Sequence, residues 1–492
     1  MRYLLGIDQG TTQTMAVIVD EFGGLVDQNP VLLSSRFPQA GWVEQDPAEI
    51  VRTVKEACAP LLDRYEISAV GFDNQGETFL LWDKDTGQPV TPAIVWQDTR
   101  GEAVCKSLAS RVDIDQLRKK TGLLLDGYFS APKIKWIFEN YPGIRERAHA
   151  GQLKFGTTET WVLWNLTGGK MHVTDPSTAS RTLLFDTGRL AWDEELLDLF
   201  DVPGCLLPGI VPSAGFIGNV DFGNGKPLPL HALLVDQQAA LFGQACFRAG
   251  EMKCSFGTGS FLLMNIGDQP RPSNHGMLTT VAWSFHGQAA YAFDGGIFTT
   301  GSAVQWLNEN LGLISNAAES HEAALRSTDF DVVVVPALQG LAAPHWRTDV
   351  RGAMFGLNRG TSSDDVVRAT LDGIACRVCE VVQAMSRDLG QSPPYLKVDG
   401  GPTGNPYLMQ MIANLLNLEV HVAQTKEATA VGIAQLAGVS AFGTSLDSLA
   451  GSWKAATVYR PGMSSEQRDK VLTRWNKAVD ILKQYHDRAP AL

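Results

Sequence analysis

Gly6-Ile7-Asp8-Gln9-Gly10-Thr11-Thr12 ends one apolar run, Tyr3–Ile7, and precedes another, Met15–Val19. Apolar runs of this length, separated by Gly and Thr, predict two β-strands joined by a tight turn. Asp46-Pro47-Ala48-Glu49 has the form of a helix start, with a capping carboxylate followed by proline and an acid, and we expect that helix to run to about Arg64. Further strands are expected at Ser68–Phe72 and Phe79–Trp82. Strands that alternate with helices predict an α/β architecture.

The same pattern recurs in the second half of the chain. Lys253–Phe256 leads into Gly257-Thr258-Gly259, and a second apolar run, Phe261–Asn265, follows. Two similar α/β halves are therefore expected, as domains of residues 1–245 and 246–492. Later strands are expected at Val332–Val335, Tyr395–Val398 and Leu418–Val422, and helices at Ser363–Ser386, Pro406–Leu416 and Ala428–Gly438.

Composition limits the classes of function. The 492 residues include 41 Lys and Arg against 53 Asp and Glu, a net charge of −12, with no basic cluster. Nucleic acids and anionic membrane surfaces are therefore not expected partners. No apolar run approaches the ~18 residues that span a bilayer. The N-terminus reaches an acid at Asp8, which is not typical of a signal peptide.

The cysteines and histidines indicate neither a disulfide framework nor a metal site. Seven cysteines are scattered along the chain, and the nine histidines show no metal-ligand spacing. Cys376 and Cys379 form a C-x-x-C pair inside a helical pattern, where two small core residues one turn apart are the expected interpretation. A reducing cytoplasm is the expected compartment.

Two glycine-threonine turns have the chemistry of a phosphate site. At Gly10-Thr11-Thr12 glycine allows close approach, while amides and hydroxyls can donate to phosphate oxygens. Asp8 at the strand end can hold Mg²⁺, directly or through water. Alone the pattern fits a hairpin with an exposed acid equally well, but Gly257-Thr258-Gly259 supplies a second turn to grip a polyphosphate.

Two further strand ends carry candidate groups. The backbone at Asp399-Gly400-Gly401 can accommodate an adenine or ribose, or can simply form a tight turn. Asp236 directly follows the apolar run Ala232–Val235, a position that suits a general base acting on a hydroxyl. Local sequence favours instead a helix N-cap for this carboxylate.

Motifs spread over the whole chain resemble the FGGY carbohydrate kinases, and most closely the glycerol kinases within that family. They include Gly41-Trp42-Val43-Glu44, Asn74-Gln75, Ala93–Asp98, Tyr128-Phe129-Ser130-x-x-Lys133, Gly156-Thr157, Val173-Thr174-Asp175, Ala179–Thr182, Asp236–Gln244 and Gly257-Thr258-Gly259. Gly352–Leu357 with Asp365–Asp372, and Tyr128–Trp136, are similar to the two diagnostic family motifs.

The resemblance implies two ribonuclease-H-like domains of the actin/hexokinase type, which flank a catalytic cleft. The N-terminal domain would bind a small polyol or sugar and the C-terminal domain ATP with Mg²⁺, for phosphoryl transfer to a primary hydroxyl. By position, the catalytic base is Asp236 and the magnesium carboxylate is Asp8. The polyol contacts are Gly76, Glu77, Trp96, Tyr128, Asp236, Gln237 and Phe261. The nucleotide contacts are Thr11, Thr12, Thr258, Gly301, Gln305, Gly401 and Asn405. A homodimer or homotetramer is implied by the resemblance alone.

Three positions depart from the glycerol kinase pattern. Gly76 replaces an arginine that donates to glycerol hydroxyls, and Asp73 replaces a usual Thr or Ser. We expect the missing side chain at Gly76 to leave space for a longer polyol or a ketose, whereas retention of glycerol is the alternative. Met15 stands where the family usually has Arg or Lys, which predicts weaker nucleotide binding or transfer. A nucleotide-binding regulatory protein without efficient kinase activity is therefore the alternative function.

Overall fold

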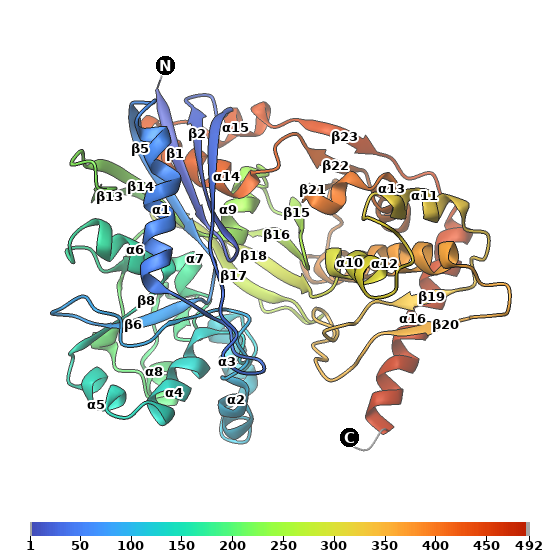
Figure 1. Ribbon diagram of the computed structural model, residues 1–492, viewed down its shortest axis with the longest axis horizontal. Helices are drawn as coiled ribbons and strands as arrows, with labels where there is room; N and C mark the ends of the chain where they lie inside the picture. Colours follow the sequence, from blue (N-terminus) through green and yellow to red (C-terminus); the bar gives the residue numbers. More distant parts are fainter. Residues whose placement is uncertain (1, 489–492) are drawn as a thin grey trace.

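The computed structural model describes residues 2–488, and the predicted hairpin lies at the centre of its first sheet (Figure 1). β1 (Tyr3–Gln9) pairs antiparallel with β2 (Gln13–Asp20) and parallel with β5 (Ile67–Asn74). The strand order is β13 (Ala214–Val220), β14 (Leu228–Val235), β5, β1, β2 and β3 (Leu25–Leu32). β1, β5 and β14 run parallel, so their carboxyl ends meet at one edge of the sheet.

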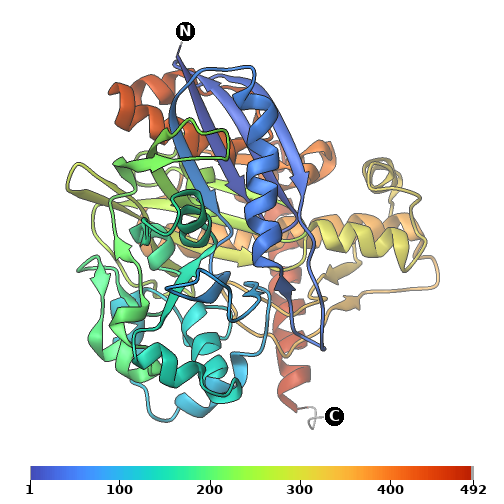
Figure 2. The ribbon, with the colours of Figure 1, turned by 60° about the vertical axis from the view of Figure 1, so that its left-hand side comes forward.

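The predicted helix start at Asp46 is confirmed. The Asp46 carboxylate accepts a hydrogen bond from the Ala48 amide at 2.9 Å, and α1 (Pro47–Leu62) begins at the proline. The helix ends slightly before Arg64 and covers the β2–β3 side of the sheet, as Figure 2 shows. Its apolar face, with Ile50 and Val54, packs in the core between helix and sheet.

The chain between β5 and β13, together with a short strand that precedes α1, forms the lower part of the first half (Figure 1). It contains a four-stranded sheet in the order β4 (Glu44–Gln45), β7 (Ala93–Ile94), β6 (Phe79–Asp83) and β8 (Leu153–Thr157). Its helices are α2 (Glu102–Leu108), α3 (Ile114–Thr121), α4 (Ser130–Asn140), α5 (Ile144–His149), α6 (Thr158–Leu166), α7 (Pro176–Ala179) and α8 (Glu194–Phe200). Short strand pairs are β9 (Val173–Thr174) with β12 (Gly209–Ile210), and β10 (Phe185–Asp186) with β11 (Ala191–Trp192).

The second half repeats the plan, as its sequence predicts. Its seven-stranded sheet has the order β17 (Leu278–Phe285), β18 (Gln288–Ile297), β16 (Ser260–Gly267), β15 (Met252–Phe256), β21 (Leu396–Gly400), β22 (Val420–Ala423) and β23 (Ala455–Tyr459). Its other elements are α10 (Gly301–Glu309), α11 (Glu319–Arg326), β19 (Val333–Val335), β20 (Ala353–Phe355), α12 (Ser363–Leu389), α13 (Pro406–Leu416), α14 (Ala428–Phe442), α15 (Leu446–Ser452) and α16 (Ser465–Arg488). No helix among residues 2–488 is long and apolar enough to cross a bilayer.

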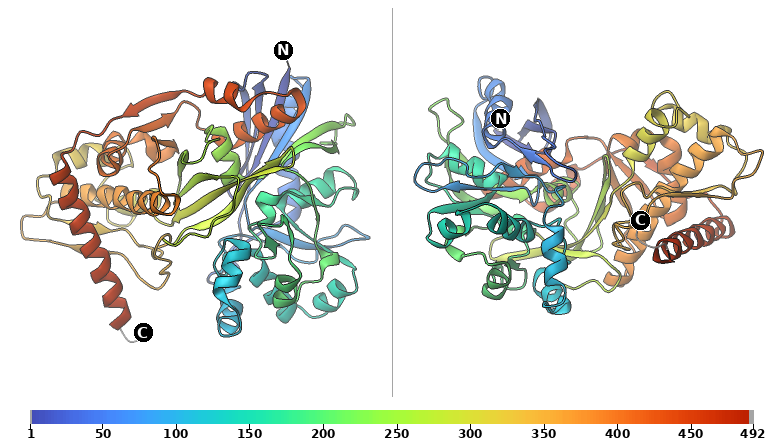
Figure 3. Two further views of the ribbon diagram at one scale, coloured as in Figure 1. Left: turned by 180° about the vertical axis from the view of Figure 1, so that it is seen from behind. Right: turned by 60° about the horizontal axis from the view of Figure 1, so that its bottom comes forward.

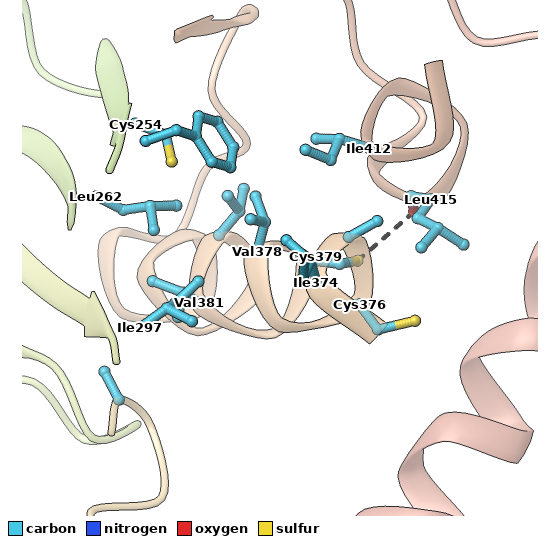
Figure 4. Packing of buried hydrophobic residues seen from close by; sticks show 14 of the residues in the cluster. Cys254, Leu262, Ile297, Ile374, Cys376, Val378, Cys379, Val381, Ile412 and Leu415 are labelled. Atoms are coloured by element: carbon cyan, nitrogen blue, oxygen red, sulfur yellow. Dashed lines mark hydrogen bonds between the residues drawn. The ribbon is translucent and has the colours of Figure 1, made fainter. Parts of the chain in front are cut away.

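The C-x-x-C pair belongs to the core, as expected. Cys376 and Cys379 are buried in α12, and the Cys379 thiol donates to the Leu415 carbonyl at 3.6 Å (Figure 4). Their neighbours are aliphatic side chains of α12, α13 and the second sheet. All seven cysteines are free thiols.

α14 comes late in the sequence but packs on the first sheet, against β1, β5 and β14, and on α9 (Asp236–Gly243). Figure 3 shows α14 and α15 beside the blue strands. Glycines allow this close approach, because a Cβ on Gly71 would overlap the Ile433 carbonyl and a Cβ on Gly432 would overlap the Ala239 carbonyl. One apolar cluster then joins side chains of the first sheet, α14 and the second sheet.

We expect Gly432→Ala to lower the free energy of unfolding by about 1–3 kcal/mol, because its methyl group meets the Ala239 carbonyl. The urea midpoint of unfolding should fall accordingly. Gly451→Ala in α15 is the matched control, since no atom lies within 4 Å of its added Cβ. The higher helix propensity of alanine would by itself stabilise each variant by up to ~1 kcal/mol relative to glycine. Equal midpoints for the two variants, measured by circular dichroism, would contradict the close packing.

Candidate active site

Three carboxylates lie at the carboxyl ends of the parallel strands. Asp8 of β1 is in register with Asp73 of β5, and Asp236 directly follows β14. Asp236 is the first residue of α9, and the cap position belongs to Val235, so the N-cap interpretation is wrong. The Asp236 Oδ1 instead accepts from the Gln237 amide at 2.7 Å. Burial raises the pKa of Asp236 above its ordinary value.

The aromatic residues expected to contact the polyol form one group. The Trp96 ring stands edge-on to Tyr128 at 5.7 Å and to Phe261 at 6.2 Å between ring centroids. The Trp96 indole N–H donates to the Thr11 hydroxyl at 2.9 Å, which ties this group to the first glycine-threonine turn. Phe261 is in β16, so both halves of the chain contribute.

Glu77 and Gln237 are each held by a buried cation that the sequence analysis did not assign. The Arg181 Nε donates to the Glu77 carboxylate at 2.6 Å, and Arg181 also lies 2.9 Å from Asp294. Despite the arginine, burial raises the pKa of Glu77 to about 7. The Lys253 ammonium donates to the Gln237 side-chain oxygen at 2.6 Å. Arg181 was visible only as part of the Ala179–Thr182 motif.

Lys133 positions the backbone around the aromatic group. Its ammonium donates to the carbonyls of Val95, Trp96 and Tyr128 at 3.2, 3.0 and 2.9 Å. The side chain is fully buried, and burial lowers its pKa to about 8. In the sequence, Lys133 stands out as part of the motif Tyr128-Phe129-Ser130-x-x-Lys133, which assigns it no role.

The residues expected to contact the nucleotide lie at adjacent strand ends of the second sheet. Phe256 and Gly400 are in register, so the turns that contain Thr258 and Gly401 are neighbours. The Gly301 amide donates to the Gly257 carbonyl at 3.1 Å, which places the start of α10 at the same edge.

The other residues expected to contact the nucleotide are Asn405, Gln305 and Thr12, and two of them bond within the protein. The Asn405 side chain caps α13 and also donates to Ser320, so its polar atoms have structural partners. Gln305 lies in α10 and donates to Glu309 on the same helix. Thr12 is exposed in the first turn.

The carboxylates at the edge of the first sheet fit a divalent cation. Burial and the charge of Asp236 raise the pKa of Asp8 to about 7, and burial raises the pKa of Asp73 well above its usual range. Both Asp73 oxygens are buried and accept no hydrogen bond within residues 2–488. Met15, across from Asp8, adds no charge. No cluster of three metal-ligating side chains occurs in the described chain, but Mg²⁺ bound through one or two carboxylates and phosphates needs none.

The space beside Gly76 is smaller than the sequence predicts. A Cβ at this position would lie 2.8 Å from Val235 Cγ2 and 3.8 Å from Arg181 Cγ. The free space expected at Gly76 is therefore absent next to its Cα, because Val235 occupies the place that a Cβ would take.

Family comparisons agree with this geometry. The model of the FGGY family of carbohydrate kinases, N-terminal domain, matches residues 3–243, and the C-terminal domain model matches residues 252–441. The chain belongs to this family. It is 45% identical over 486 residues to glycerol kinase of Halorhodospira halophila, covering 97% of this chain and 96% of that protein. Glycerol kinase 2 of Thermotoga maritima is 42% identical over 489 residues, covering 97% and 98%.

A solved structure extends the likeness to three dimensions. The crystal structure of Plasmodium falciparum glycerol kinase with ADP superposes with a TM-score of 0.92 at 35% identity, covering 98% of each chain. The expected family and its two-part α/β fold are thus confirmed.

We expect Lys133→Met to lower the thermal midpoint and to raise KM for the acceptor, because three buried or partly buried carbonyls lose their donor. Lys135→Met in the same helix is the matched control, since Lys135 forms an ion pair with the half-exposed Glu139. A loss of about 1–3 kcal/mol is the usual scale for unpaired buried polar groups. If both variants melt and turn over alike, Lys133 has no positioning role.

Proposed function

We propose that this protein transfers the γ-phosphoryl group of ATP to a primary hydroxyl of glycerol or of a somewhat larger polyol or ketose. The observation that carries the proposal is the position of Asp236, at a strand end beside Gln237 and close enough to both Asp8 and Glu77 for its charge to raise their pKa values. Full-length likeness to glycerol kinases supports the same chemistry. In this proposal the domains are residues 1–245 and 246–492, a division supported by the two family models.

Asp236 acts as the general base. A primary alcohol does not ionise near neutral pH, so a positioned carboxylate must take its proton as the new P–O bond forms. The raised pKa makes Asp236 a better proton acceptor than an exposed aspartate. Gln237 donates its amide to Oδ1 and its side chain to Oδ2, at 2.7 and 3.3 Å, and so fixes the carboxylate.

The acceptor lies among groups that suit a small polyol. Glu77 accepts hydroxyl hydrogens, while the rings of Trp96, Tyr128 and Phe261 cover C–H edges. The Thr11 hydroxyl, which accepts from the Trp96 indole, keeps its own hydrogen to donate to a phosphate oxygen. Closure of the two halves over the substrates excludes water, which otherwise competes for the phosphoryl group.

The nucleotide binds along the turns of the second sheet. The backbone at Thr258, Gly301 and Gly401 lines this edge and provides amides for phosphate oxygens. Asp8 would hold Mg²⁺, which when bound neutralises charge on the transferring phosphoryl group. The cytoplasmic location and a dimeric or tetrameric assembly stay predictions.

The experiment is a coupled assay of ADP release with glycerol, four- and five-carbon polyols and ketoses as acceptors. Acceptor-dependent ADP release supports the kinase. Tight ATP binding without release for any acceptor would favour the regulatory alternative, in line with Met15.

Asp236→Asn is expected to lower kcat by about 10²–10⁴ with nearly unchanged affinity for Mg-ATP, because the amide cannot accept the proton. Asp113→Asn, which changes a true helix cap in α3, is the control and should keep full activity. Steady-state rates and nucleotide calorimetry check both. Near-normal turnover of Asp236→Asn would remove Asp236 from the mechanism.

The acceptor affinity is expected to weaken as pH falls through about 7, because Glu77, whose pKa burial raises to about 7, then becomes neutral and stops accepting hydroxyl hydrogens. Arg181, Asp236 and Lys133 are the charged groups around it. Calorimetry of acceptor binding from pH 6 to 8.5 measures this dependence. Glu77→Gln should bind more weakly and show a flatter profile, and an unchanged profile would assign the titration to another group.

A further inference from the structure

The space beside Gly76 is closed by a rigid neighbour. The Val235 Cγ2 lies 2.8 Å from the position of a Cβ on residue 76, and Val235 is only 2% exposed. A β-branched side chain at the end of a buried strand has few alternative rotamers. Val235 also directly precedes Asp236, so the Val235 side chain is held beside the proposed catalytic carboxylate. At the Cβ position of residue 76 the site is therefore filled by Val235 rather than open.

Arg181 brings a guanidinium to this same place. Its Cγ would lie 3.8 Å from a Cβ on residue 76, and its guanidinium carbon is 6.0 Å from the centre of the Tyr128 ring. The guanidinium reaches Glu77 at 2.6 Å, which is a candidate acceptor contact. The arginine therefore stands among the residues expected to surround the polyol.

The guanidinium forms two ion pairs but one hydrogen bond. Within residues 2–488, Nε makes the one hydrogen bond of the group, to Glu77. Nη1 lies 2.9 Å from Asp294 but is buried without a hydrogen bond. An arginine has five N–H donors, and buried donors without partners are costly. Arg181 is only 5% exposed, so N–H groups beyond the one that bonds Glu77 are left to donate to the oxygens of a ligand bound beside Glu77.

We propose that Arg181 donates to the hydroxyls of the acceptor in place of an arginine at position 76, and that Val235 limits the acceptor to three carbons. This proposal rests on the proposed kinase function and selects glycerol, or a neutral triol of its size, among the acceptors. The Arg181 guanidinium is already shared between the carboxylates of Glu77 and Asp294, which disfavours an acceptor that carries a carboxylate or phosphate of its own.

The test compares kcat/KM for glycerol with that for four- and five-carbon polyols and ketoses. The parent is expected to prefer glycerol by at least about tenfold. Arg181→Lys should lower kcat/KM for glycerol by about 10–100-fold, chiefly through KM, because lysine lacks the planar fork. Arg377→Lys is the matched control, since Arg377 is an equally buried, paired arginine in α12. It should leave the acceptor KM unchanged.

Substitutions at position 235 test whether Val235 limits the size of the acceptor, and they change no charged residue at that position. Val235→Ala should raise activity on four-carbon polyols relative to glycerol. Gly76→Arg should reduce glycerol turnover through collision with Val235, and Gly76→Arg combined with Val235→Gly should recover at least part of it. These variants carry the test even if Arg181→Lys does not fold.

Three results would overturn the proposal. The first is a parent that prefers longer acceptors, and the second is an Arg181→Lys enzyme with unchanged glycerol KM. The third is full glycerol activity in Gly76→Arg alone. If the parent phosphorylates no acceptor, the proposed kinase function is wrong. Calorimetry with glycerol then tests separately whether Arg181 binds the acceptor. Glycerol binding that Arg181→Lys weakens supports the inference, and no binding refutes it.

Discussion

The close approach of α14 to the first sheet is the constraint on which the site depends. Glycines at Gly71 of β5 and Gly432 of α14 let backbone meet backbone without an intervening side chain. The resulting apolar cluster includes residues of both large sheets. Because Asp8, Asp73 and Asp236 lie at the ends of the strands that α14 covers, this packing holds the acidic edge against the second half of the protein.

Charge around the site is arranged in two separate groups. Along the edge of the first sheet, burial and the charges of neighbouring carboxylates raise the pKa values of Asp8 and Asp73. Around the acceptor, by contrast, each polar side chain has a buried cation beside it, Arg181 for Glu77 and Lys253 for Gln237. The first arrangement suits a site that receives Mg²⁺ with a nucleotide, and the second suits a neutral acceptor.

Local patterns predicted the fold well. The hairpin at Gly10, the cap at Asp46 and the repeat at Gly257 each depend on neighbouring residues, and all three are found in the structure. The helix at Ala428 was predicted, but its packing on the other half of the chain was not, because no local pattern encodes it. The surroundings of Gly76 were mispredicted for the same reason, since Val235 and Arg181 are remote in sequence.

The central claim is that the γ-phosphoryl group of ATP passes to an acceptor hydroxyl rather than to water. Phosphorus NMR of the protein with Mg-ATP and glycerol tests this most directly. The account predicts a phosphomonoester resonance that grows as the γ-phosphate resonance of ATP declines, with no matching rise in inorganic phosphate. Inorganic phosphate as the sole product, or an ATP spectrum unchanged over many hours with every acceptor, would contradict it.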